Sequence, residues 1–599
     1  MRVAVIGAGP SGLVTLKYLL TAHQFLDTEP IEVVLFEAED AVGGTFAHRT
    51  YEEAEASLVS SKQLTTFSDF RPTADDPDFL TTARYVSYLY DYCGHFNLWP
   101  HIKLSTQVVS VRRRPGGGHV VSYRPTGAWI HTGRTSHAVQ EYECDAVAVL
   151  HSADFKLKKQ FGEGKTVLVM GTGETGMDIS YMAVNAATDR VLLSHRDGFL
   201  CAPKRVPDPV ILPILGNKTE PGRLNVPVDS SSASLFDTAY VHPRLRDHML
   251  LWEYYDAFIK WTLWLVGGSR YGLGQFIGGI PDERYHASKI FFNKSNKAMP
   301  YISAPYRAAA ESTMIQRIRS SLIQVPIADT HGRHIDLAPW PDHIDSEGVV
   351  HFRDNGRREY ARLKHEKIKP DMAIFATGYT QTFPFLSPTH YSPADPTTST
   401  TTTIWHASDP TVGFIGFVRP SFGAIPPLAE LQAQLWILNL VVTRNHHPLL
   451  ALNPADEPQY RLRMSKTSRI QYGVDHESYA YQLALDMHAA PSLAEVVRLG
   501  WTYRGSDGGC NAGAWYKLPL VWALGANFNA KFRLRGPWRW EGAREVLVGE
   551  LWDTVERRGG FFGHITLSGL PMLVFGTISL VLYLLEPLLR LVFPGPRGC

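Results

Sequence analysis

The chain has 599 residues, too many for a single hydrophobic core, so its length predicts several domain-sized units. Its hydrophobic content of 44% and charged content of 20% are typical of a globular protein, and a formal net charge of +1 provides no positive field for binding nucleic acid. Its five cysteines are scattered and form no Cys-x-x-Cys pair, which argues against a disulfide scaffold, a structural zinc site and a dithiol redox centre.

The first predicted unit is a strand, a glycine-rich turn, a helix and a second strand. A β-branched run at residues 3–6 leads into the turn, which consists of Gly7, Ala8, Gly9, Pro10, Ser11 and Gly12. Its first glycine permits the tight turn, its second lets the backbone approach a pyrophosphate, and its third lets the helix pack on the sheet. The helix N-terminus then offers N–H groups to the phosphates. The pattern favours a dinucleotide site over a structural turn.

Glu37 follows the second predicted strand, residues 33–36. A carboxylate at this position suits the ribose hydroxyls of an adenine dinucleotide and repels a 2′-phosphate, so the first site favours FAD or NAD over NADP. A solvated glutamate at a strand end is the alternative interpretation.

A second copy of the turn, Gly171-Thr172-Gly173-Glu174-Thr175-Gly176, follows the apolar run at residues 167–170. The next predicted strand ends in Ser194, His195 and Arg196 instead of an acid. Arginine binds phosphate bidentately, so this site favours NADP, although a surface arginine without a ligand would look the same. The residues assigned to this site are Gly171, Gly173, Glu174, Thr175, Gly176, Met177, Asp178, Ser194 and Arg196.

The segments that follow are less clearly patterned. Residues 201–297 resemble an insertion, whose aromatic stretch at 251–264 could rest on a membrane or line a channel but is more typical of a core. Residues 348–359 predict a hairpin, and 371–375 predict a short buried strand. Beyond 445, we find no motif before the hydrophobic C-terminal segment.

That segment includes 21 residues without a charge, 565–585, which would span about 31 Å as a helix. It predicts a membrane anchor over 563–593; a buried core helix, or an interfacial helix kinked at Pro571, is the alternative. Because a predicted strand begins at Arg2, we expect no signal peptide and a cytosolic body.

Taken together, these stretches resemble the flavin-containing monooxygenases, the membrane-bound class once called dimethylaniline monooxygenases, and especially a fungal-type member. The first turn with Glu37 is similar to the family's FAD site, as are Gly44, Thr45 and Phe46 after Gly43. Lys62 and residues 67–70 resemble the segment beneath the isoalloxazine ring. The second turn resembles the NADP site, residues 376–379 the hinge between the two domains, and 413–427 the return segment of the FAD domain.

The resemblance implies an α/β fold with two Rossmann-like domains, a discontinuous one for FAD and one for NADP. We place the boundaries at 1–150 and 310–445 for the FAD domain, 151–309 for the NADP domain with its insertion at 201–297, 446–560 for a C-terminal extension, and 563–593 for the anchor. It also implies that NADPH reduces FAD, that a C4a-hydroperoxyflavin forms with O2, and that a nitrogen or sulfur of a small molecule is oxygenated. The expected location is the endoplasmic reticulum membrane, with the catalytic domains facing the cytosol.

Two departures from the family pattern bear on activity. Val59 stands where the family has an asparagine that positions the nicotinamide and the oxygenated flavin, which leaves Ser60, Ser61 and Lys62 as candidate substitutes. The segment that normally crosses between the domains is also shortened between Val149 and His151. The alternatives are therefore an inactive or uncoupled membrane-tethered flavoprotein and, because the cofactors are the same, a Baeyer–Villiger oxygenase. Phe155 fits the flavin-containing class better than the Baeyer–Villiger branch.

Overall fold

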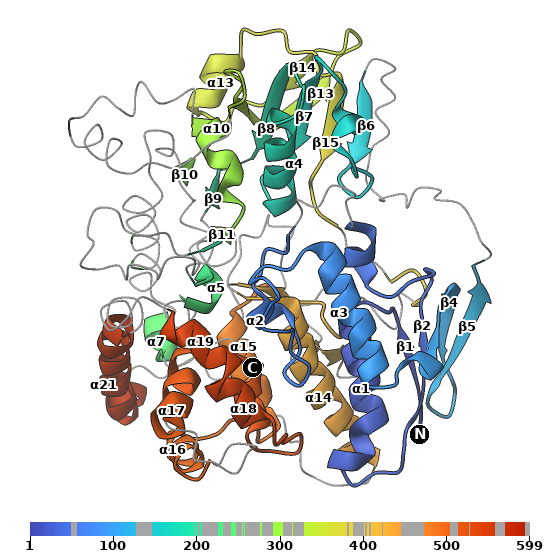
Figure 1. Ribbon diagram of the computed structural model, residues 1–599, viewed down its shortest axis with the longest axis vertical. Helices are drawn as coiled ribbons and strands as arrows, with labels where there is room; N and C mark the ends of the chain where they lie inside the picture. Colours follow the sequence, from blue (N-terminus) through green and yellow to red (C-terminus); the bar gives the residue numbers. More distant parts are fainter. Residues whose placement is uncertain are drawn as a thin grey trace.

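The computed structural model describes residues 1–49, 57–126, 147–196, 329–379, 409–444, 473–503, 513–557 and 569–592 apart from positions 422 and 526–527, with short pieces between 198 and 314 and between 383 and 406. Figure 1 shows two sheet-centred regions. The second glycine turn lies in the upper region and the first in the lower one. Most of the predicted insertion falls outside the described residues.

The lower region is built on a parallel three-stranded sheet of β1 (Arg2–Ile6), β2 (Glu32–Phe36) and β3 (Ile102–Lys103). Helix α1 (Pro10–Phe25) begins with a proline that suits the first helical turn, and it packs against the long helix α14 (Ile425–Arg444). Helix α3 (Thr82–His95) adds Tyr85, Tyr88 and Tyr92 to the same apolar core. A hairpin of β4 (Thr106–Arg113) and β5 (His119–Pro125) flanks this sheet.

The upper region holds five parallel strands in the order β12 (Ile335–Pro339), β8 (Arg190–His195), β7 (Thr166–Met170), β15 (Met372–Phe375) and β6 (Ala148–His151). Strands β7 and β8 are almost entirely buried, which matches their continuous apolar sequence. Helix α4 (Glu174–Val184) follows β7, while α10 (Met299–Ser303) and α13 (Arg358–Leu363) lie in the same region of Figure 1.

The sheet pairing corrects two of the predicted domain boundaries. Strands β12 and β15 lie within 310–445, which we assigned to the first domain, yet both belong to the sheet of the second glycine turn. Strand β6 is an edge of that same sheet, although residues up to 150 were assigned to the first domain. A short apolar run predicts a strand but not the sheet in which it finds its hydrogen-bond partners.

The predicted hairpin near 348–359 is also displaced. Strands β13 (Pro341–Ile344) and β14 (Val350–Phe352) form it, and helix α13 occupies the end of the predicted range. The small pieces that complete the fold are α2 (Lys62–Thr65), β9 (Phe199–Cys201), α5 (Val228–Ser231), α7 (Pro243–Arg246), β10 (Phe276–Ile277), β11 (Phe292–Asn293), β16 (Thr400–Thr401), β17 (Trp405–His406), β18 (Asp409–Gly413), β19 (Arg419–Pro420) and β20 (Gly473–Val474).

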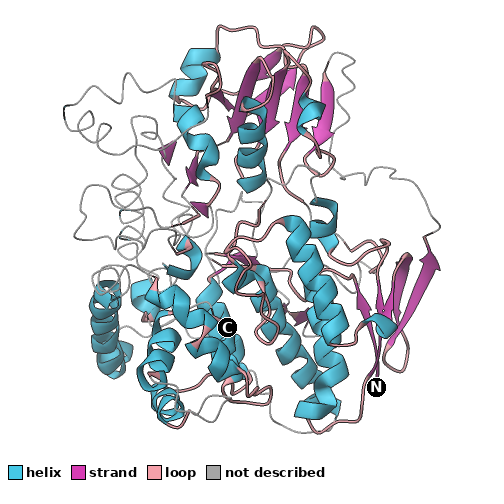
Figure 2. Ribbon diagram, viewed as in Figure 1, coloured by secondary structure: helices cyan, strands magenta, loops and turns pink. Residues whose placement is uncertain are grey.

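The C-terminal extension is a helical layer that is continuous with the first domain (Figure 2). It contains α15 (His476–Asp486), α16 (Leu493–Trp501), α17 (Ala514–Leu524), α18 (Ala543–Val548) and α19 (Glu550–Glu556). Its Arg533, fully buried, contacts Asp69 at 3.0 Å and Glu430 at 3.5 Å, and Asp69 also pairs with Lys17 of α1 at 2.5 Å. We name these four residues the Arg533 cluster. It ties the extension to α1 and α14 through charges that compensate one another.

Two described helices are long and apolar enough to cross a membrane, α14 and α21 (Leu570–Val592). The apolar window of α14 is 72% buried, as expected of a core helix, whereas that of α21 is only 17% buried. One stripe of α21, Pro571, Phe575 and Ser579, packs on the body, and Ser579 Oγ accepts a 2.9 Å hydrogen bond from the backbone N–H of His242, next to α7. Away from this stripe, α21 exposes large apolar side chains such as Leu573, Leu580, Leu584 and Leu588.

Candidate cofactor-binding site

The first glycine turn has the predicted strand–turn–helix geometry. Gly7 adopts a φ of +100°, and its N–H donates to the carbonyl of Phe36 at 2.8 Å, which seats the turn at the carboxyl ends of β1 and β2. A Cβ on Gly12 would lie 1.8 Å from the carbonyl oxygen of Gly7, so only glycine fits there. The N-terminus of α1 therefore opens directly onto the turn.

Glu37 is buried against this turn. Its carboxylate accepts hydrogen bonds from the N–H of Ala8 at 2.6 Å and from the N–H of Glu39 at 3.0 Å. Gly43 donates to the carbonyl of Ala8 at 3.0 Å, and a Cβ on Gly44 would come within 3.0 Å of the Cα of Gly9. The structure thus brings the predicted acid and the predicted glycine pair to one place.

Two further segments were predicted for the first site, residues 45–46 and the return segment. Thr45 and Phe46 lie in a short 3₁₀ helix, Gly44–Arg49, and the Phe46 ring packs edge-on against Tyr85 at 4.8 Å. The return segment also reaches the turn, because a Cβ on Gly416 would lie 2.1 Å from Ser11 Oγ.

The second turn repeats the backbone of the first. Gly171 has a φ of +110°, its N–H donates to the carbonyl of Ser194 at 3.0 Å, and a Cβ on Gly176 would lie 1.8 Å from the carbonyl oxygen of Gly171. The hinge residue Ala376 lies against this turn, where its carbonyl oxygen would be 2.6 Å from a Cβ on Gly171. Asn293 Nδ2 donates to the carbonyl of Thr172 at 3.0 Å from the other side.

Arg196 and Ser194 differ in exposure and in the groups that they contact. Arg196 is exposed at the end of β8, and its guanidinium carbon lies 4.6 Å from the ring centre of Trp340, a distance that fits a cation–π contact. Ser194 is fully buried, and its hydroxyl donates to the carbonyl of Pro339 at 2.8 Å. The side chain of Ser194 thus binds the neighbouring strand β12, and its assignment to the NADP site stays a prediction.

Three other residues assigned to the second site, Met177, Asp178 and Glu174, interact with the protein around them. The side chain of Met177 is fully buried in the core of this domain and can offer only its backbone to a ligand. Burial raises the pKa of Asp178, an effect that the charge of Lys204 and a hydrogen bond from Ser295 oppose. Glu174 Oε1 accepts from the backbone N–H of Lys294 at 3.3 Å.

The three candidate residues near Val59 have different contacts. The ammonium of Lys62 donates to the backbone carbonyls of Thr73, Ala74 and Asp76 at 3.0, 3.4 and 2.5 Å, so it holds a loop together and is not presented to a cofactor. Ser60 and Ser61 instead adjoin Asp229 and Lys294. Sequence reasoning missed this pair because each residue lies alone in the unpatterned insertion.

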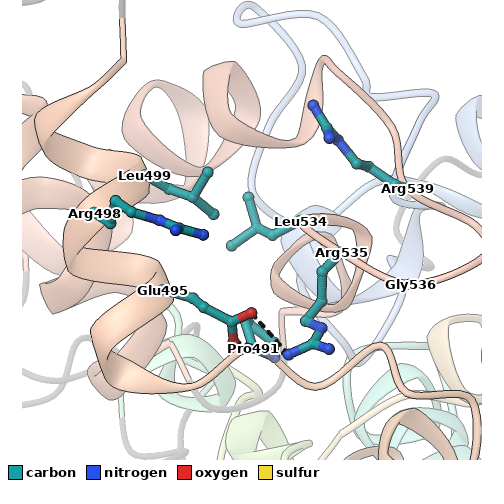
Figure 3. Close-up of a pocket in the computed structure, with 8 residues that line it drawn as sticks. All are labelled: Pro491, Glu495, Arg498, Leu499, Leu534, Arg535, Gly536 and Arg539. Carbon is teal, nitrogen blue, oxygen red and sulfur yellow. Dashed lines mark hydrogen bonds and ion pairs between the residues drawn. The ribbon is translucent and has the colours of Figure 1, made fainter.

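Figure 3 shows a pocket elsewhere, in the C-terminal extension. It is lined by Pro491, Glu495, Arg498, Leu499, Leu534, Arg535, Gly536 and Arg539. Glu495 pairs with Arg535 at 2.8 Å within it. None of the residues of the two glycine turns lines this pocket. Within the part of the chain that the structure describes, no group of three or more His, Cys, Asp or Glu could hold a metal.

Comparison with known proteins identifies the family. The family model described as flavin-binding monooxygenase-like matches residues 1–147 and 362–558. The chain is 50% identical to monooxygenase cfoE of Aspergillus candidus, over 98% of this chain and 99% of that protein. It is 44% identical to monooxygenase ptmN of Penicillium ochrochloron, over 99% and 96% of the two chains. With human flavin-containing monooxygenase 1, the identity is 25%, over 92% of each.

Among solved structures, the chain aligns with S-allyl-L-cysteine S-oxygenase from Allium sativum at 13% identity and a TM-score of 0.40, over 96% of this chain and 98% of that one. It aligns with OTEMO in complex with FAD and NADP at 15% identity and a TM-score of 0.44, over 74% and 86%. The assignment rests on the family model and on the two fungal relatives, which match nearly the whole chain. The chain therefore belongs to the flavin-binding monooxygenase-like family and is a monooxygenase whose cofactors are FAD and NADPH.

Proposed function

We propose that this protein uses NADPH and O2 to transfer one oxygen atom to a soft nucleophile, a nitrogen or sulfur, of a small molecule. The observation that carries the proposal is the pair of glycine turns, alike in backbone but followed by a buried carboxylate in one case and an exposed arginine in the other. This division suits FAD on the first turn and NADPH on the second. The choice of nitrogen or sulfur follows the family resemblance.

The residues around the first turn fit FAD. Backbone N–H groups at the start of α1 would bind a pyrophosphate, and the turn packs so tightly that a Cβ on Gly12 or Gly44 would collide with its backbone. Glu37, whose carboxylate accepts from the N–H of Ala8, would accept from the ribose hydroxyls of FAD. Bound FAD supplies the chemistry implied by the resemblance, the activation of dioxygen at the flavin C4a carbon.

The residues around the second turn fit the adenosine end of NADPH. The N–H groups at the start of α4 provide the anion site, and Arg196, held over Trp340, provides a cation for the 2′-phosphate. The contribution of the protein is then to orient the two cofactors and to exclude water from the space between them.

A second function, that of an uncoupled NADPH oxidase or an inactive flavoprotein, is favoured by the shortened crossing between Val149 and His151. Strand β1 is an edge strand of the described first sheet, and β6 is an edge strand of the second. The alignment with cfoE is 617 positions long, more than the length of this chain, so that relative has residues without a counterpart here. Without a full crossing, the cofactors would be held face to face less firmly.

A single preparation separates these functions. The purified protein is examined for bound yellow flavin, then mixed with NADPH in air while peroxide and the oxides of a tertiary amine and a thioether are measured. We expect flavin, NADPH consumption and N- or S-oxide. Peroxide without an oxygenated product would establish the uncoupled oxidase. Formation of a lactone or ester from an added ketone would establish Baeyer–Villiger oxygenation. A colourless, inert protein would refute all oxygenase functions.

We further propose that α21 attaches the protein to the endoplasmic reticulum membrane, with the catalytic domains in the cytosol. Exposed side chains such as Leu573 and Leu584, 67% and 71% exposed, support this because water-exposed apolar helices are unfavourable. Removing all residues after Gly560 should move the protein from the membrane pellet to the soluble fraction. Continued sedimentation of the shortened protein would assign the attachment to another segment.

A further inference from the structure

A buried polar cluster lies between the segment around Val59 and the second glycine turn. Its centre is Asp229 in α5, which is fully buried. Asp229 Oδ2 accepts the backbone N–H of Ser61 at 2.8 Å and the ammonium of Lys294 at 3.1 Å. Lys294 is itself buried, and its ammonium also lies 3.4 Å from Ser60 Oγ. We name Ser60, Ser61, Asp229 and Lys294 the Asp229 cluster.

The same cluster is joined to the NADPH side of the molecule. Asn293, next to Lys294, donates to the carbonyl of Thr172, and the N–H of Lys294 donates to Glu174. Thr172 and Glu174 both belong to the second glycine turn. Ser60 Oγ, on the other side, donates to the carbonyl of Gly423 in the return segment at 3.3 Å. The cluster thus contacts both cofactor-binding regions.

The Asp229 cluster contains two polar atoms that do not form a hydrogen bond within the part of the chain that the structure describes. Ser61 Oγ and Asp229 Oδ1 have no hydrogen-bond partner among the described residues, although both residues are fully buried. A buried polar atom without a partner is unfavourable, and native structures rarely tolerate it unless a ligand or a water molecule completes the bond. The cluster therefore offers an acceptor oxygen and a hydroxyl group to a ligand.

The chemistry of these two groups matches a primary carboxamide. A carboxamide donates through its NH2 group and accepts through its carbonyl oxygen, so it pairs with a carboxylate oxygen on one side and a hydroxyl on the other. NADPH carries such a group on its nicotinamide ring, at the end of the molecule away from the adenosine that the second turn and Arg196 suit. The position is also the one where Val59 removes an amide that the family resemblance would supply.

We propose that the Asp229 cluster binds the carboxamide of the NADPH nicotinamide, with Asp229 Oδ1 accepting from its NH2 group and Ser61 Oγ donating to its carbonyl oxygen. Lys294 is a positioning residue that balances the charge of Asp229. The proposal rests on the proposed function, because it requires NADPH on the second turn. It makes Ser61 and Asp229 determinants of the orientation of the nicotinamide toward the flavin.

The test measures binding to the FAD-loaded protein by calorimetry, without turnover. The probes are NADP⁺, its 3-acetylpyridine analogue, in which a methyl group replaces the NH2 group, and 2′,5′-ADP, which has no nicotinamide. We expect Ser61→Ala and Asp229→Asn to weaken NADP⁺ binding about 10- to 100-fold and to leave 2′,5′-ADP binding unchanged. Asp229→Asn should also abolish the preference for NADP⁺ over the analogue.

Ser230→Ala is the matched control, because Ser230 is buried next to Asp229 but lies outside the cluster, and its hydroxyl donates to the carbonyl of Pro227 at 3.1 Å. It should change NADP⁺ binding less than about threefold. Unchanged NADP⁺ affinity in both variants, or an equal loss for NADP⁺ and 2′,5′-ADP, would overturn the proposal, since the cluster would then be structural or filled by water. If Asp229→Asn does not fold, Ser61→Ala decides alone. Failure of the unmodified protein to bind 2′,5′-ADP would instead refute the proposed function.

Discussion

The two glycine turns are closely alike in their local geometry and opposite in the chemistry that surrounds them. Both begin with a glycine at a φ near +100°, and in both the third glycine faces the carbonyl oxygen of the first. At the end of the following strand, however, one turn has the buried carboxylate of Glu37 and the other has the exposed guanidinium of Arg196. On the proposed function, the turn accommodates a dinucleotide and the residue at the strand end selects between FAD and NADPH.

The two turns also differ in what supports them. The first is enclosed by its own domain, through Gly44, the return segment and, behind α1, the Arg533 cluster. The second is contacted from outside its sheet, by residues 293 and 294. Changes near the first turn should thus affect folding and FAD together, whereas changes near the second should affect NADPH with FAD retained.

The largest expected effect comes from Gly12→Ala and Gly176→Ala, compared side by side. The added Cβ would lie 1.8 Å from a carbonyl oxygen in each case, so the turn must be displaced. Gly12→Ala should yield protein without flavin absorbance, and Gly176→Ala a yellow protein that no longer binds NADP⁺. Gly94→Ala in α3 is the control, because a Cβ at that position would meet no heavy atom within 4 Å. Flavin retained by Gly12→Ala but lost by Gly176→Ala would reverse the assignment.

Arg533→Met should be the most destabilising single change away from the turns. It leaves Asp69 and Glu430 buried with less compensation, and breaking a buried ion pair costs about 3–5 kcal/mol of the free energy of unfolding. Urea denaturation with flavin fluorescence as the readout measures both folding and FAD release. Arg535→Met, which breaks an exposed pair with Glu495, should cost less than about 1 kcal/mol. Equal stability of the two variants would contradict a role for the cluster in the first domain.

Asp336→Asn should lower the stability of the second domain by an amount that depends on pH. Burial alone would raise the pKa of Asp336, but hydrogen bonds from His334 and Arg190 and the charge of Arg362 lower it from 3.8 to about 2. A lowered folded-state pKa gives stability that is fully present above pH 3.8 and is lost as the pH falls through about 2. The variant should therefore lose about 2 kcal/mol at neutral pH, and its difference from the unmodified protein should shrink between about pH 4 and about pH 2. A difference that stays constant with pH would exclude this ionisation as the cause.

The smallest expected effect is on the choice of nicotinamide cofactor. Arg196→Gln should reduce the preference for NADPH over NADH about tenfold, because an exposed charge-assisted contact to phosphate is lost. Trp340→Ala, which removes the ring beneath the guanidinium, should reduce it about threefold, and Trp340→Phe should reduce it less. The ratio of kcat/KM for the two cofactors gives the result. An unchanged ratio for Arg196→Gln would assign the 2′-phosphate to another residue.

The local chemistry of both turns could be predicted from the sequence because it depends on consecutive residues. Gly7 to Gly12, Glu37 and the return segment meet as expected, since each is fixed by a short-range requirement. Membership of β6, β12 and β15 in the second sheet could not be predicted, because an apolar run of four or five residues fits either sheet. The contacts of Lys62 could not be predicted either, because its ammonium binds backbone carbonyls, which every residue has.

The Asp229 cluster illustrates the same limit for side chains. Its members come from around 60, from 229 and from 294, and neither Asp229 nor Lys294 belongs to a recognisable pattern. Only the fold brings a buried carboxylate to the serines beside Val59. The extension after 445 likewise lacks a motif, although it supplies the arginine that the first domain requires.

The position of Arg533 has a consequence for synthesis of the chain. Asp69 and its partner Lys17 leave the ribosome early, but Arg533, the second cation that contacts Asp69, follows more than 450 residues later. Both glycine turns are thus translated long before the charges behind the first of them can be balanced. A product that terminates before residue 533 would carry every cofactor motif and still be a substrate for chaperones and proteases, and FAD should join the polypeptide only near the end of translation.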